Sequence, residues 1–109
     1  MVRVTDLDAS LRFYRDGLGL EVLSRRDNPG GRFTLVFLAV PGDRSAQVEL
    51  TFNWDPETYV GGRNFGHLAY AVDDMYALCS RLQAHGCRHP ASAPRWLHGV
   101  CALAQQHFG

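Results

Sequence analysis

Two segments of the sequence share a strand-to-helix pattern, and this repeat constrains the fold more than any other feature. Val4-Thr5-Asp6 superposes on Val72-Asp73-Asp74 at an offset of 68 residues, and Ala9 then falls on Ala77. In each segment an aspartate follows an apolar strand and precedes a helical pattern, and aspartate is a preferred residue at helix N-termini. The repeat predicts two similar modules within one α+β domain.

The first unit has the pattern of one strand, one helix and three further strands. Weak alternation predicts the first strand, and apolar residues spaced by four, three and four positions predict a helix that Gly17 and Gly19 end. Turn clusters at 28–31 and 41–43 separate the remaining strands. These strands are expected at residues 21–24, 33–40 and 47–53.

The second unit begins in the same way but ends differently. Residues 67–72 predict a strand, and Asp73 or Asp74 caps a helix that Gly86 stops. After it, prolines, a glycine and the run 101–106 indicate loop and a short helix rather than three more strands. We therefore expect one domain over 1–109, with a first module at 1–54 and an incomplete second module at 66–109 that carries an atypical tail at 88–109.

Charge and cysteine content exclude several classes of function. Eleven acidic residues balance eleven basic ones, so no basic surface is expected to attract nucleic acid or a membrane. All the basic residues are arginines, which excludes lysine Schiff-base chemistry. Three scattered cysteines suit a reducing compartment, and no signal peptide or membrane span is evident. The sequence therefore predicts a cytoplasmic protein that binds neither nucleic acid nor membrane.

Glu49 and His67 are the candidate metal ligands. Glu49 lies on the polar face of an alternating strand, and His67 follows Gly66 at the start of the second unit. Taken singly, each has an ordinary alternative, a solvated glutamate or a structural histidine. Together they form an oxygen and nitrogen set suited to Ni²⁺, Co²⁺ or Zn²⁺. The repeat places two further ligands outside the chain, two residues before Met1 and at position 117.

Several stretches closely resemble bacterial glyoxalase I, a member of the vicinal oxygen chelate superfamily. The resemblance covers residues 1 to about 87, and its Glu-Leu-Thr-x-Asn-Trp and Gly-His-x-Ala motifs are specific. It implies the glyoxalase-like fold of paired βαβββ modules. The stretches that carry the resemblance are Met1-Val2-Arg3-Val4, Asp6 to Tyr14, Leu18-Gly19-Leu20, Gly31 to Leu35, Val48 to Trp54 and Phe65 to Ala69.

The resemblance also implies an activity and roles for individual residues. Glu49 and His67 match metal ligands, and Arg3, Asn53 and Arg63 match residues that hold glutathione. The expected reaction is that of lactoylglutathione lyase, which isomerises the hemithioacetal of methylglyoxal and glutathione to S-lactoylglutathione through a metal-stabilised enediolate and so detoxifies methylglyoxal. Family sites lie at a homodimer interface. The chain lacks the insertion between Val40 and Glu49 that longer, zinc-using members of the family carry, so the resemblance implies Ni²⁺ or Co²⁺ rather than Zn²⁺.

Both ends depart from the family pattern, and other functions stay open. The ligand expected before Met1 and the C-terminal glutamate that serves as ligand and base are absent, so no catalytic residue is identified and weak or no activity is expected. The tail from Arg88 to Gly109 resembles translation in a shifted frame, and His98, Cys101 and His107 are alternative ligands. The alternatives are a metal-free, drug-sequestering protein of the superfamily, an iron dioxygenase and an inactive glyoxalase I.

Overall fold

The computed structural model describes residues 1–59, 67–86 and 100–104. They fall into two compact units, one formed by residues 1–59 and the other by the described residues beyond them. Both units combine strands with a helix, so the predicted α+β class is confirmed. No helix in the described ranges is long and apolar enough to cross a membrane.

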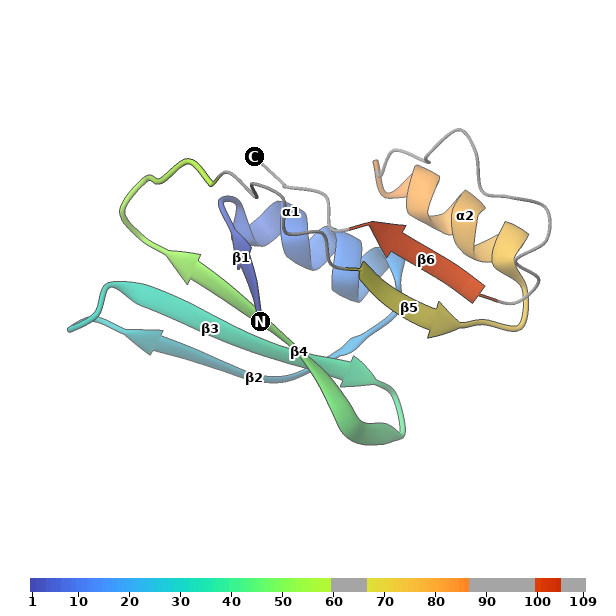
Figure 1. Ribbon diagram of the computed structural model, residues 1–109, viewed down its shortest axis with the longest axis horizontal. Helices are drawn as coiled ribbons and strands as arrows, with labels where there is room; N and C mark the ends of the chain where they lie inside the picture. Colours follow the sequence, from blue (N-terminus) through green and yellow to red (C-terminus); the bar gives the residue numbers. More distant parts are fainter. Residues whose placement is uncertain (60–66, 87–99, 105–109) are drawn as a thin grey trace. The chain divides into compact units, whose positions relative to one another are not determined.

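The first unit is a four-stranded sheet with one helical segment (Figure 1). The strand order is β1-β4-β3-β2, with β1 parallel to β4 and the other neighbours antiparallel. Two predicted strands were too short, because β2 and β4 extend along β3 through polar residues whose sequence carries no apolar alternation. The elements are β1 Val2–Val4, α1 Leu7–Leu11, η1 Arg12–Gly17, β2 Glu21–Asn28, β3 Phe33–Val40 and β4 Asp43–Asn53.

The predicted helix start and end are both confirmed. The Asp6 carboxylate accepts a hydrogen bond of 2.9 Å from the backbone N–H of Ala9 and so satisfies one of the helix's unpaired donors. The helix continues from α1 into η1, a π-helical turn, and Gly19 follows with a φ of 78°. Glycine adopts this left-handed conformation without steric cost, so the chain can turn into β2.

The core of the first unit lies on one face of the sheet. Val36 pairs with Leu50, which pairs in turn with Val2, so the three side chains point to the same side. They are 1%, 0% and 8% exposed. The helical segment is buried at its apolar positions and lies along the sheet (Figure 1). Its core residues are Leu7, Leu11, Phe13 and Tyr14.

The second unit repeats the helix start of the first. Strand β5 (His67–Ala71) leads into helix α2 (Met75–Ala84), and Asp74 accepts a 3.0 Å hydrogen bond from the N–H of Ala77. Asp74 has φ −132° and ψ 100°, and Asp6 has φ −133° and ψ 102°. The repeated strand-to-helix start is therefore present in both units, while the module limits at 54 and 66 stay predictions.

The loop and short helix expected for residues 101–106 are wrong where the structure describes them. Strand β6 (Val100–Ala104) pairs antiparallel with β5, from Ala71 opposite Val100 to His67 opposite Ala104. A short apolar run does not distinguish strand from helix by its period, and pairing with a neighbouring strand decides. The repeat does not extend to this pairing, because β1 has a parallel neighbour in β4.

Replacing Asp6 with alanine is expected to lower the free energy of unfolding by about 1 kcal/mol, the usual cost of losing an N-cap acceptor. Asp6→Asn is the matched control, because asparagine keeps the side-chain acceptor and removes only the charge. Urea denaturation followed by circular dichroism measures both. An equal loss in the two variants would contradict the cap and assign the effect to charge.

Candidate active site

Three of the five predicted site residues lie on the same face of the first sheet. Arg3 is opposite Thr51 in the β1–β4 pairing, and Glu49 and Asn53 are each two residues from Thr51 along β4. Because side chains alternate between the two faces of a strand, Arg3, Glu49 and Asn53 share the face opposite the helix-covered core. The strand predicted at residues 47–53 is confirmed as part of β4.

Apolar side chains from β3 accompany these polar groups. Phe33 is opposite Asn53, Leu35 is opposite Thr51, and Phe37 is opposite Glu49. All three β3 side chains are only half-buried within the chain. The face therefore combines a few polar groups with an apolar floor, which is the usual make-up of a small-molecule site.

Glu49 is the predicted metal ligand whose burial and hydrogen bonding the structure describes. Its side chain is half-buried, and the hydroxyl of Thr51 donates a 3.2 Å hydrogen bond to Glu49 Oε1. Thr51 is itself only 6% exposed, so this contact comes from a fixed partner. A hydrogen bond of this kind orients a carboxylate for metal binding.

The two remaining predicted site residues lie beyond residues 1–59 in the sequence. His67 is the first residue of β5 in the second unit, so its pairing with Glu49 stays a prediction. Arg63 lies outside the described residues. Within the described ranges, no group of three or more His, Cys, Asp or Glu side chains comes together as a metal site.

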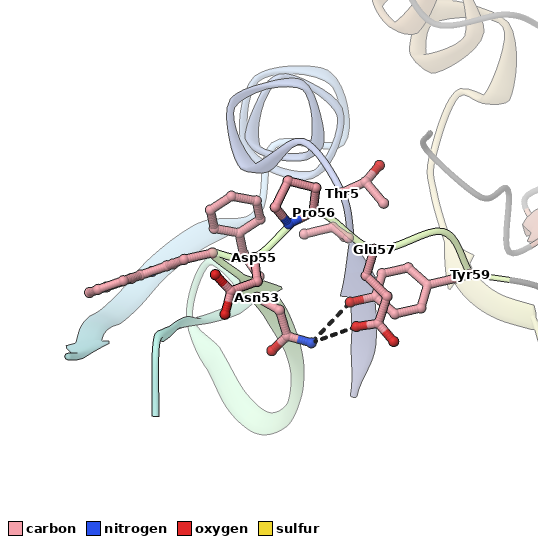
Figure 2. Close-up of a pocket in the computed structure, with 9 residues that line it drawn as sticks. Thr5, Asn53, Asp55, Pro56, Glu57 and Tyr59 are labelled. Atoms are coloured by element: carbon pink, nitrogen blue, oxygen red, sulfur yellow. Dashed lines mark hydrogen bonds between the residues drawn. The ribbon is translucent and has the colours of Figure 1, made fainter. Parts of the chain in front are cut away.

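A pocket of about 200 Å³ opens where β4 ends and the following segment begins (Figure 2). Asn53 is in its wall and donates hydrogen bonds through Nδ2 to the hydroxyl of Tyr59, at 3.0 Å, and to Glu57 Oε2, at 3.5 Å. The pocket-lining residues are Val4, Thr5, Phe52, Asn53, Trp54, Asp55, Pro56, Glu57 and Tyr59.

Residues 54–59 follow β4 and line much of the pocket. Trp54 fixes the start of this segment to β3 through hydrogen bonds. The indole Nε1 donates to the hydroxyl of Thr34 at 2.9 Å, and that hydroxyl donates to Asp27 Oδ1 at 2.7 Å. Thr34 is 3% exposed, so the indole is bound to a buried partner. A buried and satisfied polar chain of this type holds one conformation, and here it sets where the segment leaves the sheet.

Arg32 supports the same segment from the β2–β3 turn. Its carbonyl accepts a 2.9 Å hydrogen bond from the backbone N–H of Trp54, and its guanidinium lies 5.9 Å from the indole ring centroid. The guanidinium also forms a two-pronged ion pair with Asp55, with a shortest distance of 2.8 Å. These hydrogen bonds lower the pKa of the Asp55 carboxyl. The pair is exposed, so its effect is mainly to orient the segment.

Sequence reasoning missed Thr5, Glu57 and Tyr59 as members of the pocket. Thr5 follows β1, and the other two follow β4, its parallel neighbour. Parallel strands end at the same edge of a sheet, so the polar residues after both strands were the available signal. That signal does not predict the path of residues 54–59, because the path depends on the Trp54 contacts.

Comparison with known proteins gives consistent matches. The family model described as Glyoxalase/Bleomycin resistance protein/Dioxygenase superfamily matches residues 1–100. Lactoylglutathione lyase from Haemophilus influenzae is 45% identical over 87 residues, which are 79% of this chain and 64% of the relative. The lactoylglutathione lyase of Neisseria meningitidis serogroup A is 42% identical over 105 residues, 95% of this chain and 76% of the relative.

The fold agrees with these matches. The trypanothione-dependent glyoxalase I of Leishmania major superposes with a TM-score of 0.76 at 33% sequence identity, over 95% of this chain and 73% of that one. The chain thus spans from somewhat under two thirds to about three quarters of the length of these three proteins. The chain belongs to the glyoxalase/bleomycin resistance protein/dioxygenase superfamily and, within it, to the glyoxalase I (lactoylglutathione lyase) family.

Proposed function

We propose that the protein acts as a lactoylglutathione lyase in methylglyoxal detoxification, converting the hemithioacetal of methylglyoxal and glutathione to S-lactoylglutathione. The observation that carries this proposal is the common sheet face of Arg3, Glu49 and Asn53, which is next to the pocket at the end of β4. The relatives at 42% and 45% identity support the same reaction.

Each residue on this face has a chemical role in the proposal. The exposed guanidinium of Arg3 binds a substrate carboxylate with two parallel hydrogen bonds, and Arg63 is proposed to bind another. The carboxamide of Asn53 pairs with the peptide backbone of glutathione. These contacts hold the conjugate over the apolar floor formed by Phe33, Leu35 and Phe37, where solvent is partly excluded.

Glu49 and His67 are proposed to bind the divalent metal ion. The Glu49 carboxylate fits this role, because it is half-buried on the open face and already oriented by Thr51. An oxygen and a nitrogen ligand suit Ni²⁺, Co²⁺ or Zn²⁺. The resemblance to glyoxalase I members that lack an insertion between Val40 and Glu49 favours Ni²⁺ or Co²⁺. When bound, such an ion supplies Lewis-acid polarisation of the two substrate oxygens.

We also propose that the protein is a cytoplasmic homodimer. The apolar side chains of β3 on the open face stay partly exposed within one chain, and burial against other protein would stabilise them. β1 and β2 are edge strands of the four-stranded sheet, and cover by a second copy would protect them. In the dimer, Glu49 of one chain and His67 of the other would share one ion.

The half-buried Phe33 and Phe37 favour a second candidate function. A metal-free member of the superfamily could use such an aromatic floor to sequester a flat apolar ligand without chemistry. The two candidates differ in what they bind, because only the lyase requires glutathione conjugates and a metal ion.

The test combines turnover with binding of S-methylglutathione, a stable glutathione thioether. We expect S-methylglutathione to bind by calorimetry. Because no catalytic base is identified in the sequence, S-lactoylglutathione should form only slowly from methylglyoxal and glutathione in the presence of Ni²⁺ or Co²⁺. Arg3→Ala is expected to weaken that binding roughly 10-fold to 100-fold, because a charge-assisted hydrogen bond is lost. Arg44→Ala, an exposed arginine in the β3–β4 hairpin, is the matched control.

The possible outcomes separate the candidates. Binding of an aromatic ligand without metal, together with no binding of S-methylglutathione and no turnover, would overturn the lyase and support sequestration. Equal binding by the Arg3 and Arg44 variants would overturn the assignment of Arg3.

A further inference from the structure

The pocket at the end of β4 determines which end of the Asn53 carboxamide a ligand can reach. An asparagine side chain offers two N–H donors at one end and a carbonyl acceptor at the other, and these ends differ in the ligand groups they bind. In the structure, Nδ2 is directed toward Glu57 and Tyr59 and the carbonyl oxygen points away from both (Figure 2).

Glu57 determines which end of the Asn53 carboxamide faces it. A carboxylate accepts hydrogen bonds and donates none, so the end of Asn53 that faces Glu57 must be the NH₂ group. The distance from Asn53 Nδ2 to Glu57 Oε2 is 3.5 Å, which makes the hydrogen bond weak, but repulsion between the carboxylate and Oδ1 disfavours the flipped amide regardless.

Tyr59 supplies the stronger contact. Its hydroxyl accepts from the same Nδ2 at 3.0 Å. A tyrosine hydroxyl can also donate, so Tyr59 alone would tolerate either orientation. Glu57 selects the orientation, and the shorter hydrogen bond to Tyr59 holds it. Within the described part of the chain, Asn53 Oδ1 accepts no hydrogen bond from the protein, so this oxygen is available to a ligand.

We propose that Tyr59 and Glu57 are positioning residues that present the carbonyl oxygen of Asn53 to the substrate, which must therefore contribute a hydrogen-bond donor such as an N–H group. This inference rests on the proposed function, in which the substrate is a glutathione conjugate. Its peptide N–H or its ammonium group meets Asn53, and its carboxylates bind elsewhere, because the negative charge of Glu57 disfavours them beside the pocket.

Binding of S-methylglutathione tests the consequence for the ligand. Tyr59→Phe is expected to weaken binding roughly threefold to tenfold, since it releases the carboxamide. Glu57→Leu should have a similar effect, whereas Glu57→Gln should restore much of the affinity because its amide carbonyl can still accept from Asn53. Tyr76→Phe removes a hydroxyl at a 73% exposed position and should change nothing.

Nuclear magnetic resonance tests the positioning without any ligand. The side-chain N–H signals of Asn53, identified by their loss in Asn53→Asp, should shift in Tyr59→Phe and stay unchanged in Tyr76→Phe. Asn53 side-chain N–H signals that stay unchanged in Tyr59→Phe would overturn the positioning of Asn53 by Tyr59. If the signals respond but S-methylglutathione does not bind the parent protein, the proposed function and the glutathione N–H contact both fail, while the orientation of Asn53 stands.

Discussion

Glu49→Gln is expected to lower the affinity of the protein for Ni²⁺ or Co²⁺ by more than about 100-fold. Glutamine has nearly the same shape as glutamate but replaces a charged oxygen ligand with a neutral amide. Residues that only orient a metal ligand typically contribute 10-fold to 100-fold in affinity, so removal of the ligand itself should exceed that range. Metal content per chain after dialysis against a weak chelator measures the loss.

Three further variants make this result specific. His67→Ala should cause a loss of the same order, and Thr51→Val, which removes the hydrogen bond to Glu49 Oε1, a loss of roughly 10-fold to 100-fold. Glu21→Gln is the matched control, because Glu21 is an exposed glutamate at the start of β2. Full metal content in both the Glu49 and His67 variants would show that the metal site is elsewhere.

The elements of the first unit could be predicted because each follows a local sequence pattern. Asp6 is an N-cap whose side chain bonds three residues ahead, and β4 alternates because one of its faces is buried. Alternation placed Glu49 on the polar face of its strand, whereas Arg3 and Asn53 were assigned through the resemblance to glyoxalase I. The pairing of β1 with β4 then puts all three residues on one face. Local chemistry therefore sufficed for Glu49 alone.

The remaining features depend on contacts between residues distant in sequence. Strand β6 forms because its residues pair with β5, and the apolar run from Val100 to Ala104 has no period of its own. The pocket depends on Trp54 bonding to Thr34, 20 residues earlier, and on Arg32 bonding to Asp55, 23 residues later. Turn and loop propensities carry no information about such partners, so the contacts of Glu57 and Tyr59 with Asn53 could be assigned only from the structure.

Leu50→Ala is expected to lower the free energy of unfolding of the first unit by about 3 kcal/mol, within the 2–5 kcal/mol that buried leucines usually cost. Leu50 is 0% exposed and lies between Val36 and Val2 in the middle of the sheet. Truncation removes apolar contacts and leaves a cavity that paired strands on both sides cannot close. Urea denaturation followed by Trp54 fluorescence, in a Trp96→Phe background, reports on this unit.

The neighbours of Leu50 make the prediction sharper, because Glu49 and Thr51 point to the opposite face of the same strand. Stability and metal binding should therefore separate. Leu50→Ala should keep its metal content in the absence of urea, whereas Thr51→Val should lose metal affinity with less effect on unfolding. Leu50→Met, which nearly conserves volume, should cost less than about 1.5 kcal/mol. A loss below 1 kcal/mol in Leu50→Ala would contradict a core centred on this side of the sheet.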